Sequence, residues 1–182
     1  MENRIEIPLS KSKILILVLA SVAFVVAGVF IAIYPEQFTS SSMQWINNPE
    51  VIRIIGLIGI LYFTATGIYG VKKLQDKKIG LIIDDQGITD NSNAASIGYI
   101  EWQDITGIRV QQVMSTKFLL IDVSEPEKYM AKAKSKLQKR LMSANMKTSN
   151  TPLSITANTL KYDFDALETL VKGEFQKHKK DV

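Results

Sequence analysis

The sequence contains no cysteine and a single histidine, His178. Without cysteine there is no disulfide framework, no thiolate nucleophile and no cysteine-ligated metal or iron–sulfur site. One histidine also excludes a site built from several imidazole ligands. The phosphate-binding and nucleophile motifs G-x-x-x-x-G-K-[ST], G-x-G-x-x-G and G-x-S-x-G do not occur. We therefore expect a protein that is not an enzyme and that holds no cofactor or metal.

Charged residues are missing from two long stretches, residues 14–35 and 54–71. About 20 apolar residues in a helix cover the roughly 30 Å of a bilayer core. The sequence therefore predicts two transmembrane helices, over residues 14–34 and 51–71, joined by an extracytoplasmic loop over residues 35–50. The first apolar run is too long for the core of a signal peptide, so we expect it to be retained.

Small residues recur at helical spacing in both predicted spans. They are Ala23 and Ala27 in the first span and Gly56, Gly59 and Gly70 in the second. Helices in lipid associate where small residues let their backbones approach. These residues predict a tight antiparallel hairpin, or contacts between chains in a homo-oligomer. The alternative is that glycine is simply frequent in membrane helices.

Lysine and arginine are distributed unevenly around the two spans. They occur in the predicted tail (residues 1–13) and in the basic linker that follows the second span (residues 72–78), but not in the loop. This bias predicts a multi-pass protein of the cytoplasmic (inner) membrane with both termini in the cytoplasm. Tyr34, Phe38 and Trp45 are then expected to lie at the outer interface as aromatic anchors. The central parts of the spans contain no Asp, Glu, Lys or His, which argues against a pump or an ion-coupled transporter.

Residues 79–182 form the predicted cytoplasmic domain. Alternating apolar and polar residues predict a hairpin over residues 79–90, with Gly87 in its turn, and strands over residues 97–102, 105–113, 117–123, 152–158 and 159–163. A helix over about residues 164–179 is predicted to begin with a capping box, Asp165 and Glu168. Phe164, Leu167, Val171 and Phe175 form its apolar face. His178, near the end of this helix, is interpreted as a residue that the helix dipole favours.

A basic amphipathic helix is predicted between two of these strands, over about residues 126–147. Its apolar face comprises Met130, Ala133, Leu137, Leu141 and Ala144, and its basic face comprises Lys128, Lys132, Lys136 and Lys139, with Arg140 at the boundary. Such a helix can dock on anionic lipid or on a protein partner. The alternative is a solvated lysine face on a helix that packs against its own domain.

The predicted domain as a whole carries a nearly balanced charge, and only its inserted helix is basic, which argues against nucleic-acid binding. Glu101 and Asp104 flank Trp102 and are interpreted as solvated charges at a strand end. The alternative for these two carboxylates is a paired acid–base site.

The segments IGLIIDDQGITD, GYIEWQDITGI, KFLLIDV and PLSITANTLKYDFDALETLV follow one another after the basic linker. In this order the chain resembles bacterial two-span inner-membrane proteins that carry a cytoplasmic pleckstrin-homology-like (PH-like) domain. The resemblance implies an α+β membrane protein. Its helical hairpin precedes an antiparallel β-sandwich or barrel, which a C-terminal helix closes and into which the basic helix is inserted. It also implies that Trp102, Ile105 and Ile108 belong to the core.

The resemblance also bears on function. Related domains bind proteins, in some cases by adding a peptide strand to an open sheet edge. The acidic first turn, Asp84-Asp85-Gln86-Gly87, would repel the phosphorylated headgroups that basic residues bind at this position in other members. The expected function is therefore a membrane-anchored, non-catalytic interaction module for an unknown cytoplasmic or membrane protein. The alternative is a membrane-surface sensor whose basic helix docks on anionic lipid.

Overall fold

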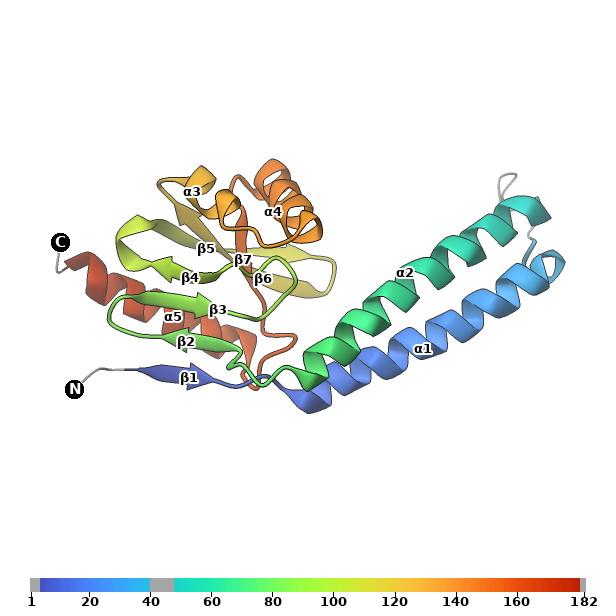
Figure 1. The fold of residues 1–182 in the computed structure, drawn as a ribbon, viewed down its shortest axis with the longest axis horizontal. Coiled ribbons are helices and arrows are strands. Elements are labelled where there is room, and N and C mark those ends of the chain that lie inside the picture. Colours follow the sequence, from blue (N-terminus) through green and yellow to red (C-terminus); the bar gives the residue numbers. More distant parts are fainter. Residues whose placement is uncertain (1–3, 40–47, 181–182) are drawn as a thin grey trace. The chain divides into compact units, whose positions relative to one another are not determined.

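The computed structural model describes residues 4–39 and 48–180. The chain is an α+β protein that divides into two compact units, residues 11–76 and residues 1–10 with 77–182. Within the described residues, the first unit is helical, and the second contains two antiparallel sheets and three α-helices (Figure 1).

The helical unit consists of α1 (Lys11–Ile33), the short 3₁₀ helix η1 (Pro35–Phe38) and α2 (Pro49–Gln75). Both α-helices are long and apolar enough to cross a membrane, judged by length and composition. Helix α2 extends beyond the predicted span at both ends. At its start, the Asn48 side chain caps the helix by accepting from the Glu50 N–H. The predicted anchors Tyr34 and Phe38 lie near Phe30, whereas Trp45 lies outside the described residues.

The contact between α1 and α2 follows one face of each helix. Ser21 and Gly28 are buried on α1, and Gly56 and Gly70 on α2. A Cβ atom on Gly56 would lie 3.0 Å from the carbonyl oxygen of Gly28, so the two backbones approach closely at this point. The hydroxyl of Ser21 donates to the carbonyl of Leu17, which satisfies it within its own helix.

Three of the predicted packing residues lie elsewhere. Ala23 and Ala27 are exposed, and a Cβ atom on Gly59 would meet nothing within 4 Å. The reason is the helical period: Ala23 is two residues from Ser21 and therefore about 200° away around the helix. Ser21 and Gly28, which were not among the predicted packing residues, are the small residues that α1 buries at this contact.

The first sheet of the domain has the order β1 (Ile5–Ile7), β2 (Leu81–Ile83), β3 (Gly87–Asp90), β4 (Gly98–Glu101), with every neighbouring pair antiparallel. Strand β1 comes from the segment predicted as a tail. Ile7 is 2% exposed, and the Ser10 N–H donates to the Thr159 carbonyl at 2.8 Å. The N-terminal segment is therefore part of the domain rather than a tail.

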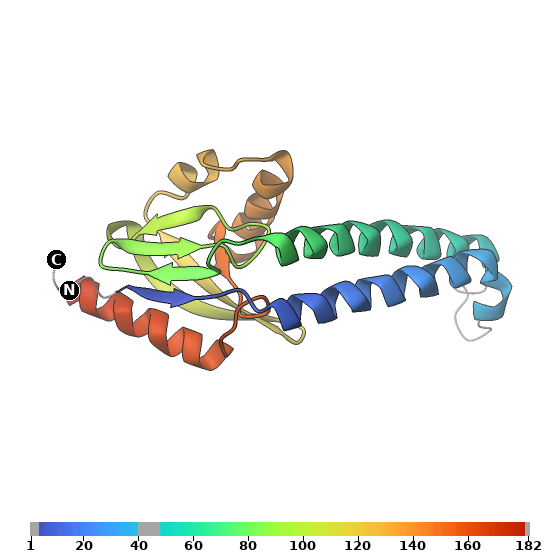
Figure 2. The ribbon, with the colours of Figure 1, turned by 60° about the horizontal axis from the view of Figure 1, so that its bottom comes forward.

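The second sheet has the order β5 (Ile105–Val113), β6 (Thr116–Val123), β7 (Leu153–Ile155). The last predicted strand, over residues 159–163, is reduced to a single bridge between Leu9 and Leu160. Helix α5 (Phe164–Lys180) runs along the two sheets (Figure 2). Its Leu167, Val171 and Phe175 are buried as predicted. Its cap is Asp163, whose carboxylate accepts from the N–H groups of residues 165 and 166, rather than Asp165.

Of the implied core residues, Trp102 and Ile105 are buried and Ile108 is half-buried. Trp102 lies in the 3₁₀ helix η3 (Trp102–Asp104), which joins β4 to β5.

The predicted inserted helix is two helices, α3 (Pro126–Ala131) and α4 (Lys136–Ser149). The chain breaks between them because the Ser135 side chain caps α4 by accepting from the Gln138 N–H. The predicted apolar face is wrong for α4: Leu137 is 63% exposed and Ala144 is exposed. The side chains that α3 and α4 bury most completely are Tyr129 and Met142. Both helices lie on the other side of the sheets from α5 (Figures 1 and 2).

Candidate functional site

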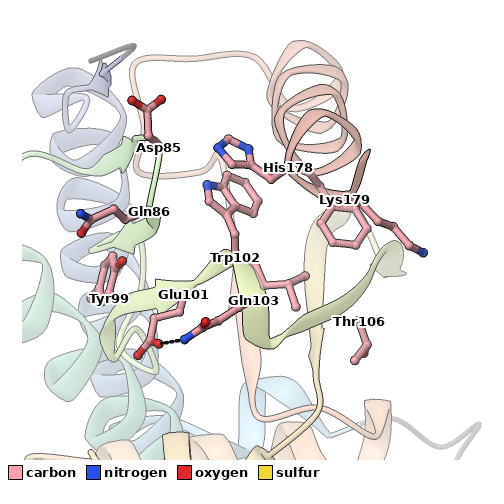
Figure 3. Close-up of a pocket in the computed structure, with 11 residues that line it drawn as sticks. Asp85, Gln86, Tyr99, Glu101, Trp102, Gln103, Thr106, His178 and Lys179 are labelled. Carbon is pink, nitrogen blue, oxygen red and sulfur yellow. Dashed lines mark hydrogen bonds between the residues drawn. The ribbon is translucent and has the colours of Figure 1, made fainter. Parts of the chain in front are cut away.

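A hollow with a volume of about 910 Å³ lies where β4, η3 and β5 meet the end of α5 (Figure 3). We call it the Trp102 groove. Its lining comes from the turn before β3, from β4 and η3, from the start of β5 and from the last turns of α5. The residues are Asp85, Gln86, Tyr99, Glu101, Trp102, Gln103, Ile105, Thr106, Phe175, His178 and Lys179.

Trp102 and His178 form an aromatic pair in this groove. The two rings stack with centroids 4.9 Å apart and planes 14° apart, and the Phe175 ring lies 6.5 Å from the indole. The indole Nε1 donates to the Asp84 carbonyl at 2.8 Å, which fixes the ring. His178, which the sequence analysis assigned only to the helix end, thus covers the indole from α5 (Figure 3). Trp102 and Phe175 are each 7% exposed and His178 is half-buried, so the imidazole is the most exposed of these three rings.

Glu101 and Asp104 are joined to α3 by an ion-pair network. The Lys128 ammonium lies 2.6 Å from Asp104 and 3.2 Å from Glu101. The Tyr129 hydroxyl donates to Asp104 at 2.5 Å and accepts from the Glu101 N–H at 3.2 Å. The two carboxylates are therefore paired groups rather than solvated charges. Their partners come from the inserted segment, so the sequence spacing around Trp102 did not reveal them.

Hydrogen bonds from Lys128 and then from Tyr129 lower the pKa of Asp104. Hydrogen bonds from Gln103 and then from Lys128 lower the pKa of Glu101. Both groups are therefore ionised at neutral pH. A paired acid–base site needs one carboxyl with a raised pKa, and these two are shifted in the same downward direction.

Strand β5 begins in the Trp102 groove and continues beyond it. Among the residues that the structure describes, β5 pairs with β6 on one side and with no strand on the other. The register shifts between Ile105 and Gly107, next to Thr106 in the groove. An edge strand of this kind presents backbone N–H and C=O groups that an added strand can bind. The groove and the edge are thus continuous.

The predicted basic residues do not form one surface. Lys128 is held by its two carboxylates, and the Lys132 ammonium lies 4.6 Å from the centroid of the Tyr129 ring. The other three, Lys136, Lys139 and Arg140, lie on α4. With Lys147, which the sequence analysis did not select, they form the basic α4 face, and together with Ser143 and Ala144 they line a shallow hollow of about 520 Å³.

Within the described ranges, no group of three or more His, Asp or Glu side chains is arranged to hold a metal ion. No family model, curated protein or solved structure matches the chain. The relation to the PH-like proteins therefore rests on the sequence resemblance and stays a prediction.

Proposed function

We propose that this protein is a membrane-anchored, non-catalytic interaction module. Its α1–α2 hairpin anchors it in the inner membrane, and a PH-like domain on the cytoplasmic side binds an extended segment of a partner protein. Two antiparallel sheets with a C-terminal helix support the PH-like assignment. The observation that carries the proposal is the Trp102 groove, which opens beside the free edge of β5.

The chemistry of the groove suggests what the bound segment contains. Its backbone would extend the second sheet at β5, which gives affinity without sequence preference. The stacked Trp102 and His178 rings suit an apolar side chain of the segment. Asp85 also lines the groove, where a basic residue next to that apolar one would pair with its carboxylate.

The hairpin supports the proposed orientation. The Lys11 ammonium, at the start of α1, donates to the carbonyls of Leu74 and Asp76 at the end of α2. The start of α1 and the end of α2 therefore lie together, so both connections to the domain leave the hairpin at one end. The basic residues that flank this end favour the cytoplasmic side.

Thiol labelling of intact cells tests the orientation. Because the chain has no cysteine, single substitutions give unique labels. Gln37→Cys, in η1, should react with a membrane-impermeant maleimide from outside. Lys161→Cys, in the domain, should react only after the membrane is permeabilised. The reverse pattern would contradict the proposed topology.

Site-specific photocrosslinking of the full chain in cells tests the groove. A photoreactive residue at Gln103, in the groove, should yield an adduct that one at Gln176, an exposed position of α5, does not. Thr106→Trp should fill the groove and abolish the adduct, whereas Gln112→Trp, further along β5, should retain it. Mass spectrometry should place the crosslink in an extended segment with adjacent apolar and basic residues. An adduct that is unaffected by Thr106→Trp, or no adduct at all, would contradict the proposal.

A further inference from the structure

Helix α4 is fixed to the domain by a mostly polar inner face. Met142 is fully buried on this face. The Gln138 amide donates to the Ser96 carbonyl at 2.6 Å, and the Asn145 amide donates to the Ser154 hydroxyl at 3.2 Å. These contacts fix the rotation of the helix about its own axis. They therefore determine which side chains point away from the domain.

The side chains on the outer face are mainly basic. Lys136, Arg140 and Lys147 are four and seven residues apart, which places them on one side of the helix, and Lys139 lies beside them. All four are exposed, and none forms an ion pair within the described part of the chain. Leu137, 63% exposed, adds an apolar side chain close to them.

This arrangement weakens the helix that carries it. Lys136 and Lys139 lie near the N-terminus of α4, where the helix dipole disfavours positive charge, and the first turn has no acidic residue. Lys136 and Arg140 are also like charges at a spacing of four, which is unfavourable. A bound anionic partner would offset both effects.

We propose that the basic α4 face docks on the anionic surface of the membrane in which the hairpin is anchored. The connections between the domain and the hairpin are short: only residues 8–10 separate β1 from α1, and only residues 76–80 separate α2 from β2. This direct tether keeps the domain at a high effective concentration near lipid headgroups. Lysine and arginine side chains bind such surfaces electrostatically, and Leu137 can enter the interface. The proposal depends on the membrane anchor but not on the Trp102 groove.

The test uses the full chain in nanodiscs, with an environment-sensitive fluorophore on Ala144→Cys. In discs that contain anionic phosphatidylglycerol, at low salt, the fluorophore should be shielded from acrylamide, a neutral quencher. Shielding should disappear in discs of neutral phosphatidylcholine and at high salt, where the attraction is screened. Each basic side chain near an anionic surface contributes about fivefold to docking. Arg140→Glu with Lys147→Glu should therefore weaken docking by at least about 30-fold.

A matched control reverses two lysines elsewhere. Lys134→Glu with Lys161→Glu gives the same change in net charge, outside the basic α4 face, and should leave the shielding in place. Circular dichroism should show the same helix content for all variants. Equal quenching in neutral and anionic discs would overturn the proposal. So would an equal loss of shielding in the control variant, or shielding that appears only when an acidic protein is added. Failure of the chain to enter discs would instead contradict the membrane anchor. The crosslinking of the groove is independent of both results.

Discussion

Tyr129 shows how one residue connects distant parts of the chain. Its ring is fully buried, and its hydroxyl connects α3 to the carboxylate of Asp104 and to the backbone of Glu101. Lys128, the adjacent residue, binds the carboxylates of both Asp104 and Glu101. Since Glu101 also lines the Trp102 groove, the inserted segment helps to position the wall of the candidate site.

This network predicts an acid-sensitive contribution to stability. Because the pKa of Asp104 is lowered in the folded state, its stabilising effect is complete above the ordinary carboxyl pKa of about 3.9. It is lost as the pH falls below that value through the folded-state pKa. The stability advantage of the natural chain over Asp104→Asn should therefore be constant near neutral pH and shrink below about pH 4. Denaturant unfolding of both chains from pH 7 to pH 3 measures this difference. If the stability difference between the two chains stayed the same down to pH 3, the lowered pKa of Asp104 would be contradicted.

Gly87 is required for a close approach rather than for a turn conformation. It does not have a positive φ, whereas Gly98 does, at 89°. A Cβ atom on Gly87 would lie 2.1 Å from the carbonyl oxygen of Ile100 in β4. The sequence predicts a turn role for Gly87. The close approach could not be predicted, because the register of Gly87 with Glu101 depends on a strand pairing that the local sequence does not specify.

We expect Gly87→Ala to destabilise the domain by about 2–3 kcal/mol, since the first sheet must open to admit the methyl group. Gly173→Ala is the control, because a Cβ atom there meets nothing within 4 Å. In the interior of α5 this change should stabilise by about 0.5–1 kcal/mol. Guanidinium unfolding distinguishes the two variants. A Gly87→Ala variant as stable as the natural chain would show that β3 and β4 do not approach as described.

At the scale of elements, local periodicity and capping explain most boundaries. The buried face of α5 follows its apolar spacing. Its cap is Asp163, because the side chain of this residue reaches the N–H groups of residues 165 and 166. The start of α4 also had a local signal, Ser135 with Gln138 three positions later. Lysines continue at helical spacing before and after Ser135, so the sequence predicted one helix instead of two.

The α1–α2 contact can be tested with an engineered disulfide. A Cβ atom on Gly67 would lie 3.4 Å from the Ser21 Cβ, close to the usual separation in a disulfide. We expect Ser21→Cys with Gly67→Cys to crosslink on mild oxidation, and Ala23→Cys with Gly67→Cys to remain reduced. Electrophoresis without reductant shows whether the product is a monomer, as the hairpin requires. A dimer-only product would place this contact between chains.

At the scale of the whole molecule, the domain is assembled from two ends of the sequence. Strand β1 and Leu9 precede the hairpin and yet complete the first sheet and contact Leu160. The hairpin is therefore an insertion within the domain, rather than an appendage in front of it.

This assembly predicts that residues 77–182 alone are less stable than the domain within the full chain. Without β1, the edge of β2 and the surroundings of Ile7 are exposed to water. A fusion of residues 1–10 to residues 77–182 through a flexible glycine–serine linker should resist limited proteolysis, whereas residues 77–182 alone should be cleaved. Equal protease resistance of the two fragments would show that the N-terminal segment is dispensable.

The two apolar helices, the alternating strands and the buried face of α5 were predictable from the sequence, because hydrophobic periodicity is a local property. The same holds for the basic character of α4. Only the tertiary structure decided three other features. They are the addition of β1 to the first sheet, the stacking of His178 on Trp102, and the pairing of Lys128 with Glu101 and Asp104. Each joins residues that are distant in the chain, and no local pattern of charge or hydrophobicity records such a contact. The Trp102 groove belongs to this second class, since its walls come from β4, β5 and α5.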